Sequence, residues 1–326
     1  MREFIDGSEA IARGALAAGC DFFAGYPITP ASGILVHMLR ELPKVGGIAI
    51  QAEDEIASMG LCIGAAMAGR KVMTATSGPG ISLYSENIGL AIMGEVPMVI
   101  VDCQRLGPAT GGATTVAQGD VQFIRWGTSG GYPIIALAPS TIPECYSLTI
   151  HAFNLAERFR TPVFLATDKE MVLTRAAVDV DAYEEVPVAS RHYAPLDEPF
   201  VPYRVAALED VPLFSPIGGP HIVRFTTSTH DEFGYLTKDP TKVDRLNRHL
   251  AAKIDAHRDE IAWVKADLEP GARTLFLSYG TTARAMWEAV ALARATGHRT
   301  SALTILTLWP VPERAILDAL EGIERV

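Results

Sequence analysis

The sequence predicts an α/β fold with a mostly parallel sheet, followed by a second, smaller α/β domain. Short apolar segments of strand type alternate with helical segments over residues 1–173, an order that is typical of parallel sheets. The alternation restarts within residues 269–326, after a Pro-rich stretch with little periodicity. With 326 residues, 48% of them hydrophobic, the chain can form one large domain or two, each with its own core.

The first domain is expected over residues 1–173. A helical pattern at 7–19 precedes a strand-type segment at 20–29, which Pro27 and Pro30 interrupt. Later apolar runs predict strands at 46–51, 71–76, 96–103, 131–139 and 161–168, and helices at 55–69, 81–94 and 143–159. The Gly/Thr-rich stretch 104–120 is too long and too polar for a simple connection and is typical of a functional or mobile loop.

Residues 174–268 are expected to form an extended connector that ends in an amphipathic helix between Lys242 and Leu268, where apolar residues recur at three-to-four spacing or multiples of it. The second domain is expected over residues 269–326, with strands at 274–280 and 300–310 and helices from Thr281 or Thr282 and from Pro312. The alternation calls for one more strand after residue 323. We therefore expect a second domain that is short of a strand, through truncation or as a short variant.

Charge and cysteine content exclude several kinds of site. The formal net charge of −10, from 38 acidic and 28 basic residues, argues against nucleic acid as a partner. Four cysteines about 40 residues apart include no CxxC pair, so no zinc or iron–sulfur site is expected, and free cysteines suit a reducing cytoplasm. No apolar run reaches the roughly 18 residues of a membrane span, and the N-terminus lacks a signal-like core.

Two loops at predicted strand ends are candidate binding sites. The turn at residues 25–30 holds Tyr26, Pro27 and Thr29, and its prolines would place the Thr29 hydroxyl rigidly. The second loop, TSGPG, contains Ser77 and Gly78, where a glycine permits close approach of a ligand to the backbone. A proline-stiffened turn without a ligand is the alternative for the first loop. The second loop matches neither a Walker A sequence nor GxGxxG.

Three charged or titratable positions are candidates for chemistry. Glu55 leads into the most apolar helix and could be a partly buried proton partner, although first-turn acids also suit the helix dipole. Arg105 follows a strand and could grip a carboxylate, or could pair at the surface with Asp102 or Asp120. His230 lies in a polar cluster of the connector that could equally serve only to order the loop. There is no GxSxG element for Ser-His-Asp hydrolysis.

Four stretches carry a resemblance to a known family: residues 25–32 (GYPITPAS), 51–111 (from QAEDEIASMG to GPATG), 116–120 (VAQGD) and 229–240 (THDEFGYLTKDP). With them the chain resembles the alpha subunits of 2-oxoacid:ferredoxin oxidoreductases, most closely those of the 2-oxoglutarate type. The similarity extends over nearly the whole chain.

The resemblance implies a thiamine diphosphate enzyme, in which this chain has a pyrimidine-binding domain at 1–173 and a transketolase-C-like domain at 269–326. It implies a beta subunit that carries the diphosphate-binding domain, Mg²⁺ and iron–sulfur clusters, since this chain has no GDG sequence for the diphosphate and no cluster cysteines. Ferredoxin, coenzyme A and a 2-oxoacid are the remaining expected partners.

Residue by residue, the resemblance matches Glu55 to the family glutamate that hydrogen-bonds the aminopyrimidine ring. Thr29 and Arg105 match the positions that hold the oxo and carboxylate groups of the substrate, and Tyr26 and Pro27 line the same loop. Ser77 and Gly78 are expected at the cofactor, and His230 matches without a role. Leu106 stands where the family commonly has glycine, which could alter how closely this loop approaches the substrate.

The expected activity is oxidative decarboxylation of a 2-oxoacid, with 2-oxoglutarate favoured, to an acyl-CoA, CO₂ and reduced ferredoxin. The chain is expected to be active only with its beta subunit. Alternatives are the same chemistry on pyruvate or a branched-chain 2-oxoacid, a non-redox thiamine enzyme, or a non-catalytic subunit. Retention of Thr29, Glu55 and Arg105 argues against the last of these.

Overall fold

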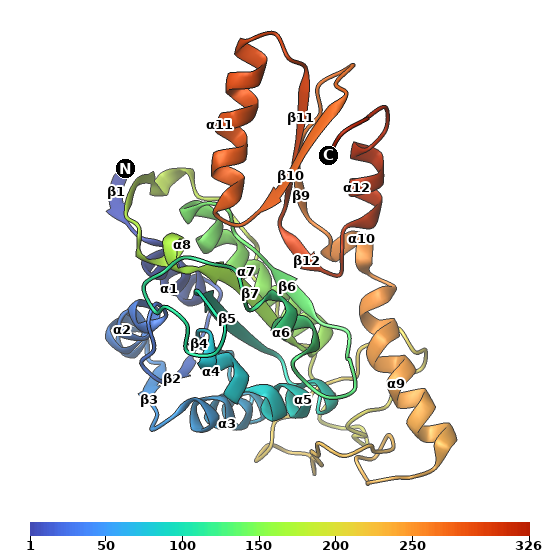
Figure 1. The fold of residues 1–326 in the computed structure, drawn as a ribbon. Helices are drawn as coiled ribbons and strands as arrows, with labels where there is room; N and C mark the ends of the chain where they lie inside the picture. Colours follow the sequence, from blue (N-terminus) through green and yellow to red (C-terminus); the bar gives the residue numbers. More distant parts are fainter.

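A computed structural model describes all 326 residues and shows a large α/β domain, a long connector and a small C-terminal α/β domain (Figure 1). The strands are β1 (Arg2–Ile5), β2 (Phe22–Gly25), β3 (Ile48–Gln51), β4 (Val72–Thr76), β5 (Met98–Gln104), β6 (Ile135–Leu137), β7 (Pro162–Asp168), β8 (Ala176–Asp179), β9 (Val264–Asp267), β10 (Thr274–Tyr279), β11 (Thr300–Ile305) and β12 (Thr307–Trp309). The α-helices are α1 (Gly7–Ala17), α2 (Ser32–Glu41), α3 (Glu55–Met67), α4 (Pro79–Leu83), α5 (Ser85–Met93), α6 (Val121–Trp126), α7 (Ile142–Phe159), α8 (Lys169–Leu173), α9 (Pro240–Asp255), α10 (Arg258–Ile261), α11 (Thr282–Ala295) and α12 (Glu313–Ala319).

The large domain is built on a seven-stranded sheet of order β12-β6-β7-β5-β4-β2-β3. All of its strands are parallel except β12, which pairs antiparallel with β6. Every residue of β4, β5 and β7 is buried, because helices cover both faces of the sheet. The predicted α/β class with a mostly parallel sheet is confirmed.

The two faces of the sheet have separate hydrophobic cores. Side chains of α1, α2 and α7 form the larger core on one face, and those of α3, α5 and α6 form the other. Strand β2 is followed by β3 on one side and then, through α3, by β4 on the other. The strand order therefore reverses between β2 and β4, and ligands of open α/β sheets bind at such points, outside the carboxyl ends of the strands.

The connector is fastened to the large domain by a buried arginine. Arg191 forms two bonds with the Glu157 carboxylate, at 2.7 and 2.8 Å, and both side chains are 2% exposed. The same guanidinium donates to the carbonyl oxygens of Ala66 and Arg70, each at 3.0 Å, and lies over the ring of Phe214. A stretch without regular secondary structure is thus fixed by one guanidinium that makes four hydrogen bonds.

A second buried charge cluster fixes α9. Lys253 donates to Glu95 Oε2 at 2.7 Å, and His249 Nε2 lies 3.2 Å from the same oxygen. Burial alone would raise the pKa of Glu95, but Lys253, His249 and Arg160 outweigh it and hold that pKa well below its usual value. Helix α9 is thereby joined to the turn that precedes β5.

The predicted amphipathic helix over Lys242–Leu268 is wrong in its length. Helix α9 ends at Asp255, α10 adds one turn, and Val264–Asp267 form strand β9. Strand β9 pairs antiparallel with β11, which a helical pattern could not predict. The domain boundaries at residues 173 and 268 stay predictions.

The C-terminal domain has a three-stranded sheet of order β10-β11-β9 flanked by α11 and α12. The predicted strand at 300–310 is divided in two, because the backbone changes sheets at Leu306: Leu306 N donates to Trp263 O, and its carbonyl accepts from Ala138 N at 2.8 Å. Strand β12 thus belongs to the large sheet. Beside β10, Arg325 makes a single parallel bridge with Thr274 at the position of the further expected strand.

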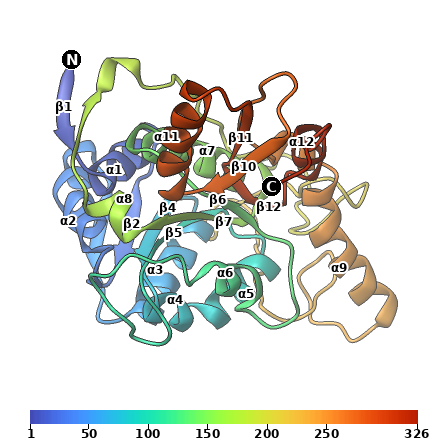
Figure 2. The same cartoon turned by 45° about the horizontal axis from the view of Figure 1, so that its top comes forward.

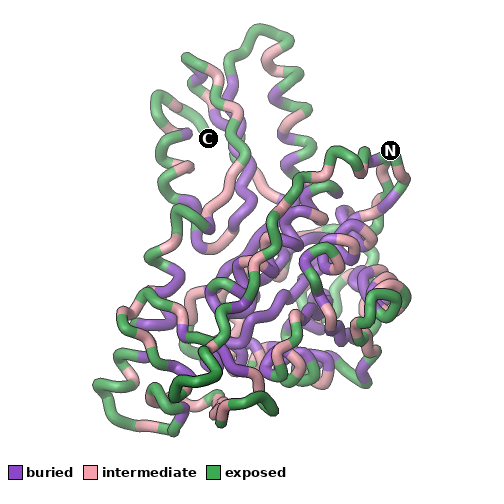
Figure 3. Tube along the Cα trace, turned by 180° about the vertical axis from the view of Figure 1, so that it is seen from behind, coloured by how far each residue is buried: buried purple, intermediate pink, exposed green.

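Burial differs between the two domains. In Figure 3 the central sheet of the large domain is almost wholly buried, whereas much of the C-terminal domain is exposed or half-buried. All four cysteines are free and buried, as the apolar sequences around them predict. None of the helices combines the length and apolar character needed to cross a bilayer.

We expect Arg191→Ala to lower the free energy of unfolding by about 3–5 kcal/mol, because it leaves the Glu157 carboxylate buried without its partner. Urea unfolding followed by circular dichroism measures the loss. Arg248→Ala is the control, since Arg248 and Asp244 form an exposed pair, 69% and 61% exposed, and the expected loss there is below about 0.5 kcal/mol. Equal losses in the two variants would contradict the role assigned to Arg191.

Candidate active site

The candidate site lies where the strand order reverses, at the carboxyl ends of β2, β4 and β5. Thr29 follows β2, Ser77 and Gly78 follow β4, and Arg105 follows β5. Glu55 begins α3, which runs between β3 and β4. The fold therefore gathers segments from residue 26 to residue 105 along one edge of the sheet, as the parallel arrangement predicts.

Arg105 connects the loops of this edge. Its side chain is buried, and Nη1 donates to Thr29 O at 2.6 Å while Nη2 donates to Thr110 O at 2.9 Å. Nε is buried without a hydrogen-bond partner and lies 3.2 Å from where a Cβ of Gly78 would be. The interpretation of Arg105 as a surface arginine is therefore wrong, and part of its donor capacity is left over for a ligand.

Gly78 is held in a backbone conformation that favours glycine, with φ of 44°. Its N–H donates to Asp120 Oδ2 at 3.2 Å, and the Asp120 N–H in turn donates to Gln104 Oε1 at 3.2 Å. The neighbouring Ser77 hydroxyl is buried and has no partner within the chain. The β4 loop thus presents a fixed backbone and a free hydroxyl.

Glu55 is a buried carboxylate at the start of α3, 8% exposed. The preceding Asp54 caps the helix by accepting from Ala57 N at 2.7 Å, so Glu55 is not the capping residue. Glu55 Oε1 lies 2.8 Å and Thr76 Oγ1 2.2 Å from where a Cβ of Gly80 would be. Only glycine fits at position 80, and the carboxylate lies directly against the beginning of α4.

The loop after β2 is accessible. Thr29 and Pro27 are exposed and the Tyr26 side chain is 36% exposed, whereas Pro30 is buried. The Thr29 carbonyl is the group bound to Arg105. This loop therefore presents side chains outward while its backbone is held from beneath.

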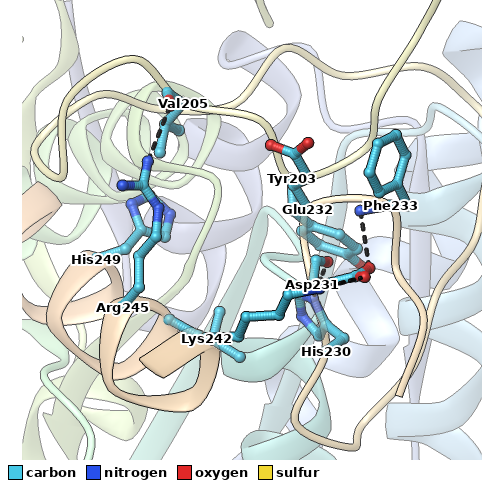
Figure 4. Close-up of a pocket in the computed structure, with 10 residues that line it drawn as sticks. Tyr203, Val205, His230, Asp231, Glu232, Phe233, Lys242, Arg245 and His249 are labelled. Atoms are coloured by element: carbon cyan, nitrogen blue, oxygen red, sulfur yellow. Dashed lines mark hydrogen bonds and ion pairs between the residues drawn. The ribbon is translucent and has the colours of Figure 1, made fainter. Parts of the chain in front are cut away.

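His230 lies elsewhere. Its Nε2 is 3.2 Å from Met93 O, at the end of α5, and its ring packs on Tyr203 with centroids 4.0 Å apart. This position precedes β5, whose seven residues place it about 20 Å from the strand end that carries Arg105. Figure 4 shows it beside a cavity of about 210 Å³ between the connector and α9, lined also by Phe233 and Arg245. These contacts suit a residue that orders the connector.

Sequence reasoning missed two carboxyl groups beside the site as functional candidates, the buried Asp102 and the half-buried Asp120. Asp102, within β5, is fully buried and neither of its oxygens has a partner in the chain. Burial, together with the nearby charge of Asp120, raises the pKa of Asp102 well above the usual 3.8. Burial also raises the pKa of Asp120, although the Gly78 N–H and Arg105 oppose this shift. An aspartate inside an otherwise apolar strand was the signal available.

Tyr84 is a further residue that sequence reasoning did not single out. It is fully buried, and its hydroxyl lies 2.8 Å from Thr74 Oγ1. Burial raises the pKa of Tyr84, the hydrogen bond with Thr74 opposes this shift, and Cys62 and Glu55 add to it. The phenol therefore stays neutral behind Glu55.

Ligands of open α/β sheets bind at such a switch point, and the buried Glu55 carboxylate with the unpartnered Ser77 hydroxyl and Arg105 Nε suits a polar cofactor or substrate. Residues 13–246 match the family model described as pyruvate flavodoxin/ferredoxin oxidoreductase, thiamine diphosphate-binding, and the chain belongs to this family. The predicted family and its thiamine-binding fold are confirmed.

Four relatives that are 40–44% identical to this chain carry the name 2-oxoglutarate synthase subunit KorA. The 2-oxoglutarate synthase subunit KorA of Methanocaldococcus jannaschii is 44% identical over 313 residues, which cover 95% of this chain and 84% of the relative. The KorA subunit of Methanothermobacter thermautotrophicus is 43% identical over 320 residues, which cover 98% of this chain and 84% of the relative.

Among solved structures, a 2-oxoglutarate:ferredoxin oxidoreductase from Magnetococcus marinus, with 2-oxoglutarate, coenzyme A and succinyl-CoA bound, aligns with a TM-score of 0.94 at 30% identity. The alignment covers 99% of this chain. This chain spans 57% of the length of that one.

The raised pKa of Asp102 predicts a pH dependence of stability. In the folded chain this carboxyl group keeps its proton at pH values where the unfolded chain has lost it. Its contribution to the free energy of unfolding is therefore fully present below a pH of about 4, and it is lost as the pH rises toward the folded pKa. Asp102→Asn imitates the protonated group and cannot ionise. The unfolding free energy of the variant should fall less steeply with pH than that of the unaltered chain, and the two slopes should differ by up to about 1.4 kcal/mol per pH unit.

Urea midpoints at intervals between pH 4 and 9 provide the measurement. Asp244→Asn is the matched control, because Asp244 is exposed on α9 and should leave the slope unchanged. An Asp102→Asn profile parallel to that of the unaltered chain would show that Asp102 ionises normally.

Proposed function

We propose that this chain is the alpha subunit of a thiamine diphosphate-dependent 2-oxoglutarate:ferredoxin oxidoreductase. In the overall reaction the 2-oxoacid loses CO₂, two electrons pass to ferredoxin, and the acyl group is joined to the sulfur of coenzyme A with release of the thiol proton. The observation that carries the proposal is that Glu55 and Arg105 are both buried at one edge of the sheet, in a chain 44% identical to a 2-oxoglutarate synthase subunit.

The site residues fit the pyrimidine half of thiamine diphosphate. Glu55 offers a buried acceptor, the Ser77 hydroxyl has no partner within the chain, and Gly78 leaves room for the Arg105 side chain beside the same loop. Tyr26 and Pro27 would line the exposed side of the ring. The bound cofactor would supply the nucleophilic carbon, while Glu55, in a low-dielectric setting, would hold and move the proton at the ring nitrogen.

Arg105 and Thr29 would orient the 2-oxoacid. Arg105 Nε is buried and unpartnered, so a substrate carboxylate entering the site would satisfy it and gain a charge-assisted bond. Thr29 stands on the loop that Arg105 itself holds, which fixes the distance between the two groups. A two-point grip of this kind places the reacting carbon in one orientation.

The rest of the machinery is assigned to partner chains. The four cysteines are buried and scattered, and no group of three or more potential metal ligands lies together in the structure. We assign the diphosphate-binding domain, Mg²⁺ and the iron–sulfur clusters to a beta subunit, and ferredoxin is the acceptor. Free thiols suit a reducing compartment, and we place the enzyme in the cytoplasm.

Helix α3 offers the surface for this beta subunit. Its outer side exposes Ile56 (53%), Leu61 (39%) and two glycines, Gly60 and Gly64, beside which a Cβ would meet no atom. An exposed apolar strip on a helix that begins with Glu55 suits close packing by a second chain. The partner that covers it would complete the cofactor site.

The decisive test is anaerobic co-expression with a candidate beta subunit from the same organism, followed by a viologen reduction assay with coenzyme A and a panel of 2-oxoacids. Coenzyme A-dependent reduction fastest with 2-oxoglutarate supports the proposal. Faster reduction with pyruvate or a branched-chain acid would assign that acid as the substrate instead. Binding of thiamine diphosphate without viologen reduction by any acid would favour a non-redox enzyme or a non-catalytic subunit.

Glu55→Gln should lower turnover by at least about a hundredfold, because an amide cannot accept and return the proton that a buried carboxylate exchanges. Assembly with the beta subunit should be unchanged, as judged by gel filtration. Glu53→Gln, at an exposed residue two positions before α3, is the control and should keep full activity. Turnover surviving in the Glu55 variant would refute the proton role.

Arg105→Ala should raise the KM for the 2-oxoacid by about ten- to a hundredfold, the effect of losing a hydrogen bond to a charged group. The KM for coenzyme A should stay within about twofold. Arg105→Lys keeps the charge but cannot hold Thr29, Thr110 and the substrate together, so it should also be impaired. Unaltered steady-state kinetics in both variants would exclude a carboxylate grip.

A further inference from the structure

The C-terminal domain meets the loop that follows Arg105 at one buried carboxylate. Asp168 is the last residue of β7 and is 2% exposed. Its Oδ1 accepts from Met171 N at 2.9 Å and so caps α8, which fixes the side chain. Its Oδ2 accepts from Gln118 Nε2 at 3.0 Å and from the hydroxyl of Thr281. Thr281 directly precedes α11, so two distant parts of the chain share one oxygen atom.

Gln118 belongs to the segment 106–120, which has no helix or strand of its own. The same segment is bound to the candidate site at two other points. Arg105 Nη2 donates to Thr110 O, and Asp120 Oδ2 accepts from Gly78 N. The segment is therefore held at Thr110, Gln118 and Asp120, and only Gln118 links it to the C-terminal domain through Asp168.

The backbone of the C-terminal domain also lies against this contact. Gly280 has φ of 60°, and a Cβ on it would be 2.5 Å from Gln118 Nε2 and 3.8 Å from Asp168 Oδ2. A side chain at position 280 would displace the Gln118 amide. The approach is therefore close because residue 280 is glycine. Figure 2 shows β10 and the beginning of α11 above the carboxyl end of the large sheet.

We propose that the C-terminal domain positions the 106–120 loop, and with it Arg105, through the Thr281–Asp168–Gln118 contact. Gln118 and Thr281 are positioning residues: they act on the 2-oxoacid through the loop and Arg105. The inference deepens the proposed function and rests on it. Without the contact, the loop would populate additional conformations. The measured affinity for the 2-oxoacid would then fall in proportion to the fraction of molecules whose loop keeps the binding conformation.

The first variants are Thr281→Val and Gln118→Leu, assayed in the assembled enzyme. Each should raise the KM for the 2-oxoacid about tenfold, while kcat and the KM for coenzyme A stay within about twofold. Because both residues act through one oxygen, the double variant should be no worse than either single variant, a non-additivity that a double-mutant cycle measures. Additive losses would overturn the shared contact.

Matched controls separate this role from a general loss of stability. Thr296→Val removes a hydroxyl at the other end of α11, where it donates to Ala293 O, and Gln122→Leu changes an exposed glutamine of α6. Both should leave the KM unchanged. Thr281→Ser keeps the hydroxyl, so its KM for the 2-oxoacid should equal that of the unaltered enzyme. A raised KM in Thr281→Ser equal to that of Thr281→Val would overturn the hydrogen-bond assignment.

Hydrogen exchange in the assembled enzyme tests the contact without turnover. The amides of Leu106 and Gly112 are hydrogen-bonded within the loop, to Thr115 O and Leu106 O, and should exchange faster in Thr281→Val but not in Thr296→Val. Unchanged exchange refutes the contact whatever the enzyme does. Faster exchange with an unchanged 2-oxoacid KM refutes its role in positioning. An unaltered complex that reduces viologen with no 2-oxoacid would instead refute the proposed function.

Discussion

The placement of α9, the helix that leads into the C-terminal domain, depends on the buried carboxylate of Glu95. It follows α5 in a left-handed conformation, with φ of 51°, which is costly for a residue other than glycine and persists because Lys253 and His249 bind its side chain. Arg160, with φ of 45°, follows α7 in the same way and donates to Leu213 O of the connector. Two helix ends therefore carry the charges that hold α9 and the connector, and α9 leads into the C-terminal domain.

The site follows from strand order. The chain leaves β2 toward β3 at one side of the sheet and leaves β4 toward β5 at the other side. The loops after β2 and β4 therefore diverge, and a ligand can bind between them. Arg105, from the central strand, reaches the Thr29 carbonyl, and Glu55 comes from the helix between β3 and β4. In the function that we propose, the chain provides one wall of the cofactor site, and a second chain that packs on the exposed apolar face of α3 provides the other.

The C-terminal domain has only small cores of its own, and two of its contacts with the large domain differ in kind. It contributes β12 to the edge of the large sheet, antiparallel to β6, and Thr281 to the Asp168 carboxylate. The first contact is backbone pairing and fixes the domain as a whole. The second reaches the loop beside Arg105, so a domain without candidate residues of its own can still influence substrate binding.

The sequence by itself determined the class of fold, the family and the set of candidate residues at the strand ends. Periodicity identifies buried strands and helices locally, and the family stretches are contiguous in the chain, so both are readable without tertiary contacts. Tertiary structure alone decided the ends of α9, the division between β11 and β12, the distance of His230 from the other candidates, and the burial of Asp102. These depend on which distant segment supplies a partner: Val264 becomes strand because Ile305 pairs with it, and Asp168 joins two domains because Gln118 and Thr281 both reach its oxygen.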